Sequence, residues 1–201
     1  MLSIIDDFYE PHDLGLMTLA FLNLPFSQTF HSIEWPISHR MQGYPCWETR
    51  KLPHQESDVS PYQIFLKTFI KKTNIKPIVI KTLFRKIKLE ELKQAEIYKK
   101  ERPHKDNNIF DFAGLVYYNS NSIKDGTKLY NFETDFEPTA IAGSRINRCV
   151  FYNPQQPHSA PTDQWVDERW VQPFFLITKE ETFKKFKEDE KQGEHKEWNT
   201  A

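Results

Sequence analysis

His104, Asp106 and His158 are the residues of this chain whose types and spacing could bind a metal ion. Two imidazoles and one carboxylate can hold a divalent ion on one face and leave the opposite face open to other ligands. His104 and Asp106 would project to the same side of an extended segment, because side chains alternate along a strand. His158 would have to come from a neighbouring strand. This donor set suits Fe(II), and zinc, manganese and nickel also accept it.

A His-x-Asp pattern is weak evidence when it stands alone. The chain has 7 histidines, and a single histidine is more often a surface or hydrogen-bonded residue than a metal ligand. The weight of the pattern therefore depends on the elements that would position these three side chains.

The composition favours one soluble domain. With 201 residues, of which 38% are hydrophobic, the chain can bury one core. Its net charge of -1 gives no global reason to expect nucleic acid or an anionic membrane as a partner. No apolar run is long enough to span a membrane, and Asp6 and Asp7 stand where a secretory signal would be apolar, so we expect a cytoplasmic protein. Cys46 and Cys149 support neither a disulfide framework nor a thiolate zinc site.

The N-terminal part of the chain is expected to contain the helices. Apolar spacing predicts a strand over 3–8 and a helix over 11–24. A second helix is predicted over 61–73, with Ser60 as its cap and Pro61 in its first turn. The stretch 25–61 lacks periodicity and contains several prolines, so it is expected to be irregular or briefly extended.

After Pro77 the pattern changes to short strands separated by turn signals. The predicted strands cover 78–83, 112–118, 128–132, 148–152 and 169–178. Helices followed by many short strands predict an α+β fold with a β-sandwich or jelly roll at its centre. The chain is divided into a single domain over 1–178 and a Lys- and Glu-rich C-terminal helix or disordered tail over 179–201.

The order of the segments around the three candidate ligands strengthens the metal hypothesis. The stretch 101–106 is followed by the strand-like blocks 112–119 and 126–130, then by 147–154, His158 and 169–176. This series resembles the Fe(II)/2-oxoglutarate-dependent oxygenase superfamily, and within it the prolyl-4-hydroxylase-like branch with its small bacterial and viral members. The resemblance covers about residues 90 to 177. It implies a double-stranded β-helix, the cupin-like form of the jelly roll, with N-terminal supporting helices.

The resemblance assigns roles to five residues. His104, Asp106 and His158 would bind iron, and Arg169 would bind the far carboxylate of 2-oxoglutarate. Arginine suits this role because its planar fork can donate two parallel hydrogen bonds to a carboxylate. Tyr118 would support the same carboxylate, and Tyr117 would then face away from it, because neighbours on a strand alternate.

The chain departs from the family pattern at two places near this site. Pro173 is expected to interrupt the strand that carries Arg169, because proline removes a ladder hydrogen bond. Asp125-Gly126 stands where the family often has two glycines, and the aspartate is expected to be tolerated in a turn. Arg148 has the position of a commonly structural arginine.

The activity implied by the resemblance is a dioxygenase reaction. Fe(II), 2-oxoglutarate and O2 would be used, with ascorbate as a candidate reductant, and succinate and CO2 would be released while a C–H bond is hydroxylated. The substrate is open between a peptide side chain such as proline and a small molecule. The alternative is a non-catalytic jelly-roll protein that binds a metal or ligand or serves in assembly.

Partners other than the substrate receive little support from the sequence. The Lys-rich stretches 67–76 and 81–88 contain apolar residues, which favours solvated faces of a helix and a strand over a nucleic-acid surface. Trp35, Tyr44 and Trp47 could line an entrance to the site, although such aromatic residues are as often part of a satellite core. The oligomeric state is left open.

Overall fold

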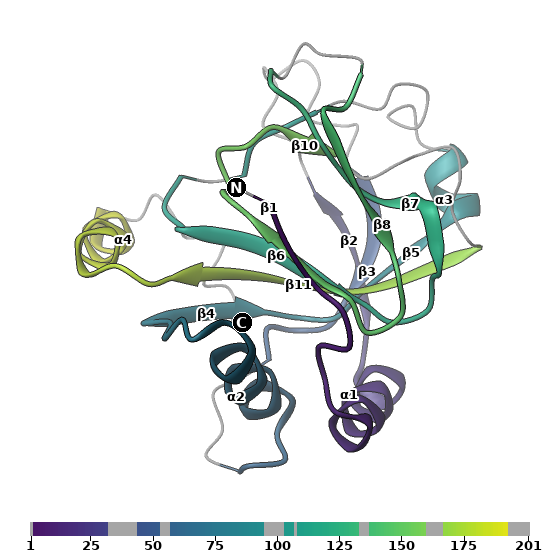
Figure 1. Ribbon diagram of the computed structural model, residues 1–201, viewed down its shortest axis with the longest axis horizontal. Helices are drawn as coiled ribbons and strands as arrows, with labels where there is room; N and C mark the ends of the chain where they lie inside the picture. The colour runs from purple at the N-terminus through teal and green to yellow at the C-terminus, as the bar shows by residue number, and fades with distance from the viewer. Residues whose placement is uncertain are drawn as a thin grey trace.

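Two antiparallel sheets face each other, and two helices cover the outer face of the larger sheet (Figure 1). The computed structural model describes residues 2–31, 44–52, 57–94, 103–106, 108–132, 137–159 and 167–192. The large sheet has the strand order β1 (Leu2–Ile5), β9 (Cys149–Tyr152), β6 (Phe112–Tyr117), β11 (Glu168–Ile177), β5 (Arg85–Lys88), β3 (Tyr44–Glu48) and β2 (Ser27–His31), and β4 (Val79–Thr82) also pairs with β11. The small sheet has the order β10 (His158–Ser159), β7 (Ser122–Leu129) and β8 (Ala140–Ser144).

The helices are α1 (Pro11–Asn23), α2 (Pro61–Thr73), α3 (Leu89–Gln94) and α4 (Glu180–Gln192). Helix α2 begins as the sequence predicts: the Ser60 hydroxyl accepts a hydrogen bond from the Gln63 backbone N–H, and Pro61 occupies the first turn. The helix ends at Asn74, whose left-handed backbone conformation (φ 58°) stops the helical hydrogen bonds. Among the described residues, no helix is long and apolar enough to cross a membrane.

Alternation along the strands of the large sheet divides the core into two layers. The outer layer packs under α1 and α2 and includes Phe21, Phe65, Phe69, Phe174 and Tyr118. The inner layer lies between the two sheets and consists of Ala113, Tyr117, Leu129, Ala142, Val150, Tyr152 and Val171. Both faces of β6 and β11 are therefore covered. The space between the sheets, which we call the barrel interior, is where strands of both sheets can present polar side chains.

The expected interruption of β11 by Pro173 is wrong. The strand runs continuously over Glu168–Ile177 and pairs with β6 from Val171 to Leu176. The Pro173 carbonyl faces the junction between β4 and β5 and accepts hydrogen bonds from the Leu83 N–H and the Thr82 hydroxyl. The edge of Pro173 that lacks an N–H thus faces the junction between two partner strands. Few inter-strand hydrogen bonds are lost there.

The predicted α+β class with a jelly-roll core and N-terminal supporting helices is confirmed. The expected turn at Asp125-Gly126 is wrong, because both residues lie within β7. The charged C-terminal stretch begins as α4, whose Phe183 and Phe186 pack against Ile109, Phe110 and Ile177. Residues 193–201 of the predicted tail lie outside the described residues, as does Trp35.

Candidate metal centre and cosubstrate pocket

The backbone brings His104, Asp106 and His158 together at one edge of the small sheet. His104 and His158 form an antiparallel bridge in which each N–H donates to the other's carbonyl at 2.9 Å. The Asp106 N–H donates to the Pro154 carbonyl at 2.9 Å, which continues the pairing past the bridge. Residues 104 and 106 thus extend beside the segment before β10, and their alternate side chains share one side.

The donor atoms of the three side chains lie close to the separations expected of ligands around one ion. His158 Nε2 lies 3.3 Å from Asp106 Oδ2, and His104 Nε2 lies 3.9 Å from Asp106 Oδ1. One donor atom from each of the three residues can be chosen so that all lie within 4.8 Å of one another. Donors about 2.1 Å from a metal are about 3 Å apart at a right angle and about 4 Å apart when opposite. The site therefore needs only small side-chain rotations to hold a metal, and no other such group occurs among the described residues.

His158 is oriented for metal binding by its own turn. Its Nδ1 lies 2.9 Å from the Gln156 carbonyl oxygen, which can only accept, so Nδ1 carries the hydrogen and Nε2 is left with its lone pair directed at Asp106. The Gln156 side chain donates in turn to the Tyr130 carbonyl. Burial lowers the pKa of His158 to about 4, against a smaller opposing effect of the Gln156 carbonyl, so the ring is neutral at neutral pH.

Asp106 is recessed behind the more exposed His104. Their side chains are 19% and 40% exposed, respectively. Burial raises the pKa of Asp106, and the nearby His104 and Arg85 act against this rise. A divalent cation would favour the ionised carboxylate here far more strongly than these two neighbours do. The chemistry of the donor set thus fits a divalent metal.

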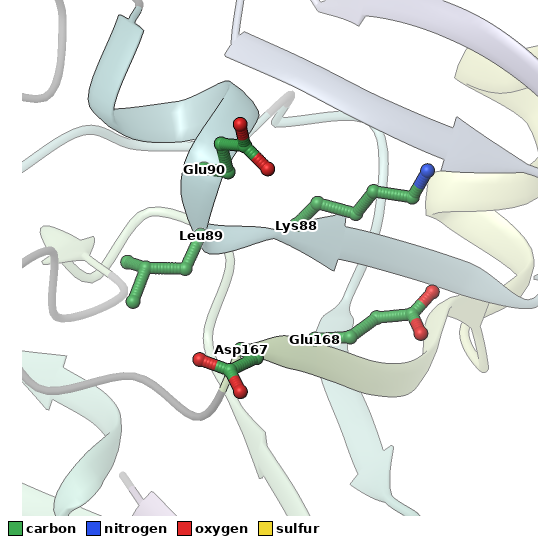
Figure 2. Close-up of a pocket in the computed structure, with 5 residues that line it drawn as sticks. All are labelled: Lys88, Leu89, Glu90, Asp167 and Glu168. Carbon is green, nitrogen blue, oxygen red and sulfur yellow. The ribbon is translucent and has the colours of Figure 1, made fainter.

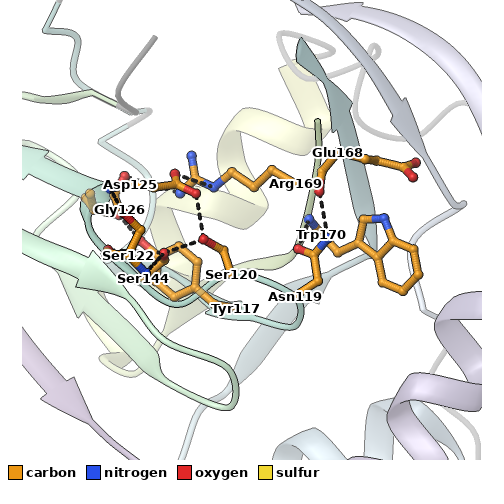
Figure 3. A network of polar contacts seen from close by, with 11 residues as sticks. Tyr117, Asn119, Ser120, Ser122, Asp125, Gly126, Ser144, Glu168, Arg169 and Trp170 are labelled. Carbon is orange, nitrogen blue, oxygen red and sulfur yellow. Dashed lines mark hydrogen bonds and ion pairs between the residues drawn. The ribbon is translucent and has the colours of Figure 1, made fainter. Parts of the chain in front are cut away.

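Arg169 occupies the barrel interior from the first part of β11. Its side chain is 2% exposed, its Nη2 donates to the Gly126 carbonyl at 3.2 Å, and its guanidinium carbon lies 5.2 Å from the centre of the Tyr117 ring. Asp125 Oδ1 lies 3.8 Å from Arg169 Nε. Figure 3 shows these residues gathered between β6, β7 and β11. A buried guanidinium in such a polar group can bind a carboxylate.

The sequence prediction for the two tyrosines is reversed in the structure. Tyr117 lies in the inner layer beside Arg169, and its hydroxyl is 2.9 Å from the Thr127 hydroxyl. Tyr118 lies in the outer layer under the helices and donates to Gln172 Oε1 at 2.8 Å. Tyr118 is thus not brought to the candidate site, and the expectation that Tyr117 faces away is wrong. Both faces of β6 are buried, so its sequence contains no sign of which tyrosine points inward.

Tyr152 joins the metal centre to the arginine. Its ring centre lies 4.6 Å from that of His158, and it belongs to the same buried cluster as Tyr117. Burial strongly raises the pKa of Tyr152, and the negative charge of Asp106 raises it further, whereas the positive charge of Arg169 lowers it. On the facing sheet, Leu129 is opposite His158 and Thr127 follows two residues away, about 7 Å along the strand. One continuous interior therefore contains both groups.

Several solved structures have the same architecture as this chain. A prolyl hydroxylase from Trichoplax adhaerens, solved with a peptide fragment of the hypoxia inducible factor oxygen degradation domain, has a TM-score of 0.60 at 14% identity, with 90% of this chain and 85% of that chain covered. HygX from Streptomyces hygroscopicus, solved with nickel, 2-oxoglutarate and hygromycin B, has a TM-score of 0.57 at 12% identity, with 88% and 83% covered. The chain has the fold of the 2OG-Fe(II) oxygenases.

A third structure of this oxygenase fold leads to the same result. An oxidoreductase of the 2OG-Fe(II) oxygenase family from Burkholderia pseudomallei has a TM-score of 0.58 at 9% identity, with 89% of this chain and 86% of that chain covered. No protein-family model matches the chain, and no curated protein sequence matches it. At these identities the likeness establishes the fold.

Sequence reasoning missed two charged pairs inside this oxygenase fold. Asp125 beside Arg169 was assigned to a turn. The other pair is Arg85 and Glu48, whose Nε and Oε1 lie 2.6 Å apart on the inner faces of β5 and β3. Arg85 is a strand neighbour of Val171, so it lies diagonally from Arg169. The sequence could have indicated the position of Arg85, because Arg85 lies two residues before the apolar Ile87 and side chains two apart on a strand share one face. No such pattern in the sequence indicated the position of Glu48.

A separate pocket lies outside the metal centre. It has a volume of about 360 Å³ and is lined by Lys88, Leu89, Glu90, Asp167 and Glu168, where β5 passes into α3 beside the start of β11 (Figure 2). Its side chains are mixed in charge and none is a candidate metal ligand.

Of the aromatic residues expected at an entrance to the site, Trp47 donates to the Glu91 carboxylate of α3. The side chain of Tyr44 lies outside the described residues.

Proposed function

We propose that this chain is an Fe(II)- and 2-oxoglutarate-dependent dioxygenase. The observation that carries the proposal is the convergence of His104, Asp106 and His158 within one fold that also buries Arg169 beside Tyr117. Two imidazoles and a carboxylate leave open positions on the metal, which is the arrangement used by non-haem Fe(II) oxygenases. The nickel, 2-oxoglutarate and hygromycin B bound to HygX, a protein of the same fold, support the choice of cosubstrate.

Each residue of the site has a distinct task in this proposal. His104, Asp106 and His158 would hold the metal, and the Gln156 carbonyl fixes the His158 ring so that Nε2 faces it. Arg169 and the Tyr117 hydroxyl would bind the far carboxylate of 2-oxoglutarate in the interior. The apolar side chains of Leu129 and Val171 exclude water around it. Bound iron with 2-oxoglutarate and O2 supplies the oxidising power that hydroxylates a C–H bond, with release of succinate and CO2.

The substrate would approach the metal from the side where His104 is exposed. A peptide side chain such as proline and a small molecule both remain within the proposal, since one neighbour of this fold was solved with a peptide and another with hygromycin B. Arg85, whose charge acts on Asp106 and which forms an ion pair with Glu48 on the inner faces of β5 and β3, is a candidate contact for a polar substrate group. We propose a cytoplasmic location for the protein.

The test is 2-oxoglutarate turnover under controlled iron loading. The protein is purified anaerobically and supplied with Fe(II), ascorbate and 2-oxoglutarate, and succinate is measured after air is admitted, with and without candidate substrates. The expected result is succinate formation above background even without substrate, and a rise when a true substrate is added.

The double variant Asp106→Ala/His158→Ala is the control for this assay. It removes two of the three proposed ligands and leaves Arg169 and Tyr117 in place. Native protein that forms no more succinate than this variant would contradict the dioxygenase proposal. Stoichiometric iron binding without succinate formation would instead indicate the non-catalytic metal-binding jelly roll.

A further inference from the structure

Asp125 is a carboxylate inside the interior that the proposed reaction does not use. It is fully buried at 0% exposure, and Oδ1 lies 3.8 Å from Arg169 Nε. Its Oδ2 accepts a hydrogen bond from the Ser120 hydroxyl at 2.7 Å, whereas Oδ1 accepts none among the described residues. Figure 3 shows Asp125 and Arg169 directed toward each other above Ser120 and Ser144.

An irregularity in β7 turns this carboxylate inward. The pairing of β7 with β8 shifts between Ser122 and Gly126, so extra residues of β7 bulge from the ladder. Gly126 closes the bulge against β8: a Cβ there would lie 2.0 Å from the Ala142 carbonyl oxygen, so no other residue fits without a shift. The inward position of Asp125 is thus built into the strand.

Asp125 and Gly126 act on the same edge of the guanidinium. Asp125 faces Nε, and the Gly126 carbonyl accepts from Nη2. These two nitrogens form one of the two edges through which arginine can grip a carboxylate with parallel hydrogen bonds. The positive charge of Arg169 is therefore compensated by a resident anion before a ligand arrives, and a second carboxylate brought to this guanidinium would be repelled by Asp125 in a poorly screened interior.

We propose that Asp125 determines the cosubstrate specificity of the site by reducing its preference for an anionic tail. This inference rests on the proposed function, since it concerns the residues proposed to bind the cosubstrate. A 2-oxo acid whose far end is a neutral hydrogen-bonding group meets the Tyr117 and Thr127 hydroxyls and the guanidinium without repulsion from Asp125. The pocket thus accepts 2-oxoglutaramate, the amide of 2-oxoglutarate, with an affinity close to that for 2-oxoglutarate itself.

The experiment measures affinities under anaerobic conditions by calorimetry, so that turnover is not needed. Fe(II)-loaded protein is titrated with 2-oxoglutarate, with 2-oxoglutaramate, and with 2-oxopentanoate, which has a methyl group in place of the far carboxylate. The wild type is compared with Asp125→Asn, which keeps the shape and removes the charge. Asp58→Asn is the matched control, because it removes a carboxylate that is 82% exposed and paired only with Lys67 among the described residues.

The expected result has two parts. Wild type and Asp58→Asn bind 2-oxoglutarate and 2-oxoglutaramate within about tenfold of each other, and Asp125→Asn raises the preference for 2-oxoglutarate by about tenfold or more. A wild type that prefers 2-oxoglutarate by more than about 100-fold overturns the inference. An Asp125→Asn variant that weakens all ligands equally also overturns it, since Asp125 would then be only structural.

Two outcomes separate this inference from the proposed function. If the wild type binds Fe(II) but none of the three 2-oxo acids, the proposed function itself fails and the inference fails with it. If 2-oxoglutarate binds tightly and selectively, only the inference fails. Should Asp125→Asn not fold, as judged by circular dichroism and thermal unfolding, the selectivity of the wild type alone decides between these results.

Discussion

The two ends of the barrel interior are built in opposite ways. At the metal end, the side chains of His104 and Asp106 are 40% and 19% exposed, and the backbone there is an isolated bridge beside a two-residue strand. At the arginine end, Arg169 is 2% exposed and Asp125 is fully buried, and both come from long strands. The proposed metal ligands His104 and Asp106 therefore lie at the edge of the small sheet, where solvent reaches them, whereas Arg169, the proposed anchor of the cosubstrate carboxylate, lies within the fold.

The charged residues at the two ends are expected to contribute differently to the stability of the fold. Asp106 is a half-buried carboxylate whose pKa is raised by the loss of contact with water, so its charge does not stabilise the fold. Arg169 and Asp125 depend on each other, because removing one leaves the other as an uncompensated buried charge. Asp106 should then be replaceable at little cost in unfolding free energy, and Arg169 should not.

The largest expected effect is on metal affinity at the first of these ends. Asp106→Ala should weaken Fe(II) binding by more than about 100-fold, since loss of the supporting contacts of a ligand alone costs 10- to 100-fold. Equilibrium dialysis with metal analysis measures the affinity, and urea unfolding of the metal-free protein should give the same free energy as the wild type within about 1 kcal/mol. A large loss of stability would contradict the distinction between the ends.

The next effect is on the stability of the arginine end. Arg169→Ala should lower the free energy of unfolding by about 3–5 kcal/mol, because Asp125 is left buried without its cation. Arg145→Ala is the matched control: the side chain of this arginine is 49% exposed, it pairs with Asp6 and Asp7 at the surface, and its loss should cost about 1 kcal/mol or less. Equal costs for the two variants in urea unfolding would show that the buried pair is not special.

A third effect concerns the anchor of the segment that follows the metal ligands. Asp111 accepts hydrogen bonds from the backbone N–H groups of Thr178 and Lys179 and from the hydroxyls of Thr178 and Thr182, which fixes the chain after residue 106 to the end of β11 and the start of α4. Asp111→Asn should cost about 1–3 kcal/mol at neutral pH. The Fe(II) affinity should fall only slightly, since the triad is held by its own bridge.

The cost of Asp111→Asn should depend on pH. Burial raises the pKa of Asp111, but the hydrogen bonds from Thr178, Lys179 and Thr182 outweigh it, so the pKa lies below 3.8. A carboxylate whose pKa is lowered by folding contributes stability above its unfolded pKa of about 3.9, and this is lost as the pH falls through the folded value. Urea unfolding of both proteins from pH 7 to pH 2.5 should show a constant difference above about pH 5 and a shrinking one below about pH 4. A constant difference throughout would contradict the assignment.

The smallest expected effect compares neighbours on one strand. Tyr117→Phe should weaken 2-oxoglutarate binding to the Fe(II)-loaded protein a few-fold, by about 1 kcal/mol for one hydrogen bond. Tyr118→Phe should leave this affinity unchanged, because its hydroxyl lies in the outer layer with Gln172. Calorimetry on both variants measures the two affinities. A stronger effect of Tyr118→Phe than of Tyr117→Phe would indicate that Tyr118 binds the cosubstrate, as the sequence predicted.

The sequence predicted the parts of the site that depend on local spacing. His104 and Asp106 share one side because they are two residues apart, and the family resemblance carried by the order of the segments after them implied the jelly-roll fold and the role of His158. It did not predict which of Tyr117 and Tyr118 points inward, since both faces of β6 are covered. That choice depends on the placement of α1 and α2 against the sheet.

The remaining errors were also tertiary in origin. Asp-Gly is an ordinary turn signal, and only the pairing of β7 with β8 shows that Asp125 belongs to a bulge directed at Arg169. The sequence predicts that Pro173 interrupts its strand. The structure shows that Pro173 instead faces the junction between β4 and β5, where a missing N–H costs little. Asp-Gly usually forms a turn and proline usually interrupts a strand. In this protein, pairing with the neighbouring strands places both within continuous strands.

The most direct test of the metal centre is an anomalous diffraction map at the iron absorption edge, from crystals grown and soaked with Fe(II) under anaerobic conditions. The account predicts one strong peak within bonding distance of His104 Nε2, the Asp106 carboxylate and His158 Nε2, and its absence in crystals of Asp106→Ala. A peak at other residues, or no peak in protein crystals that hold their fold, would contradict the assignment of this site.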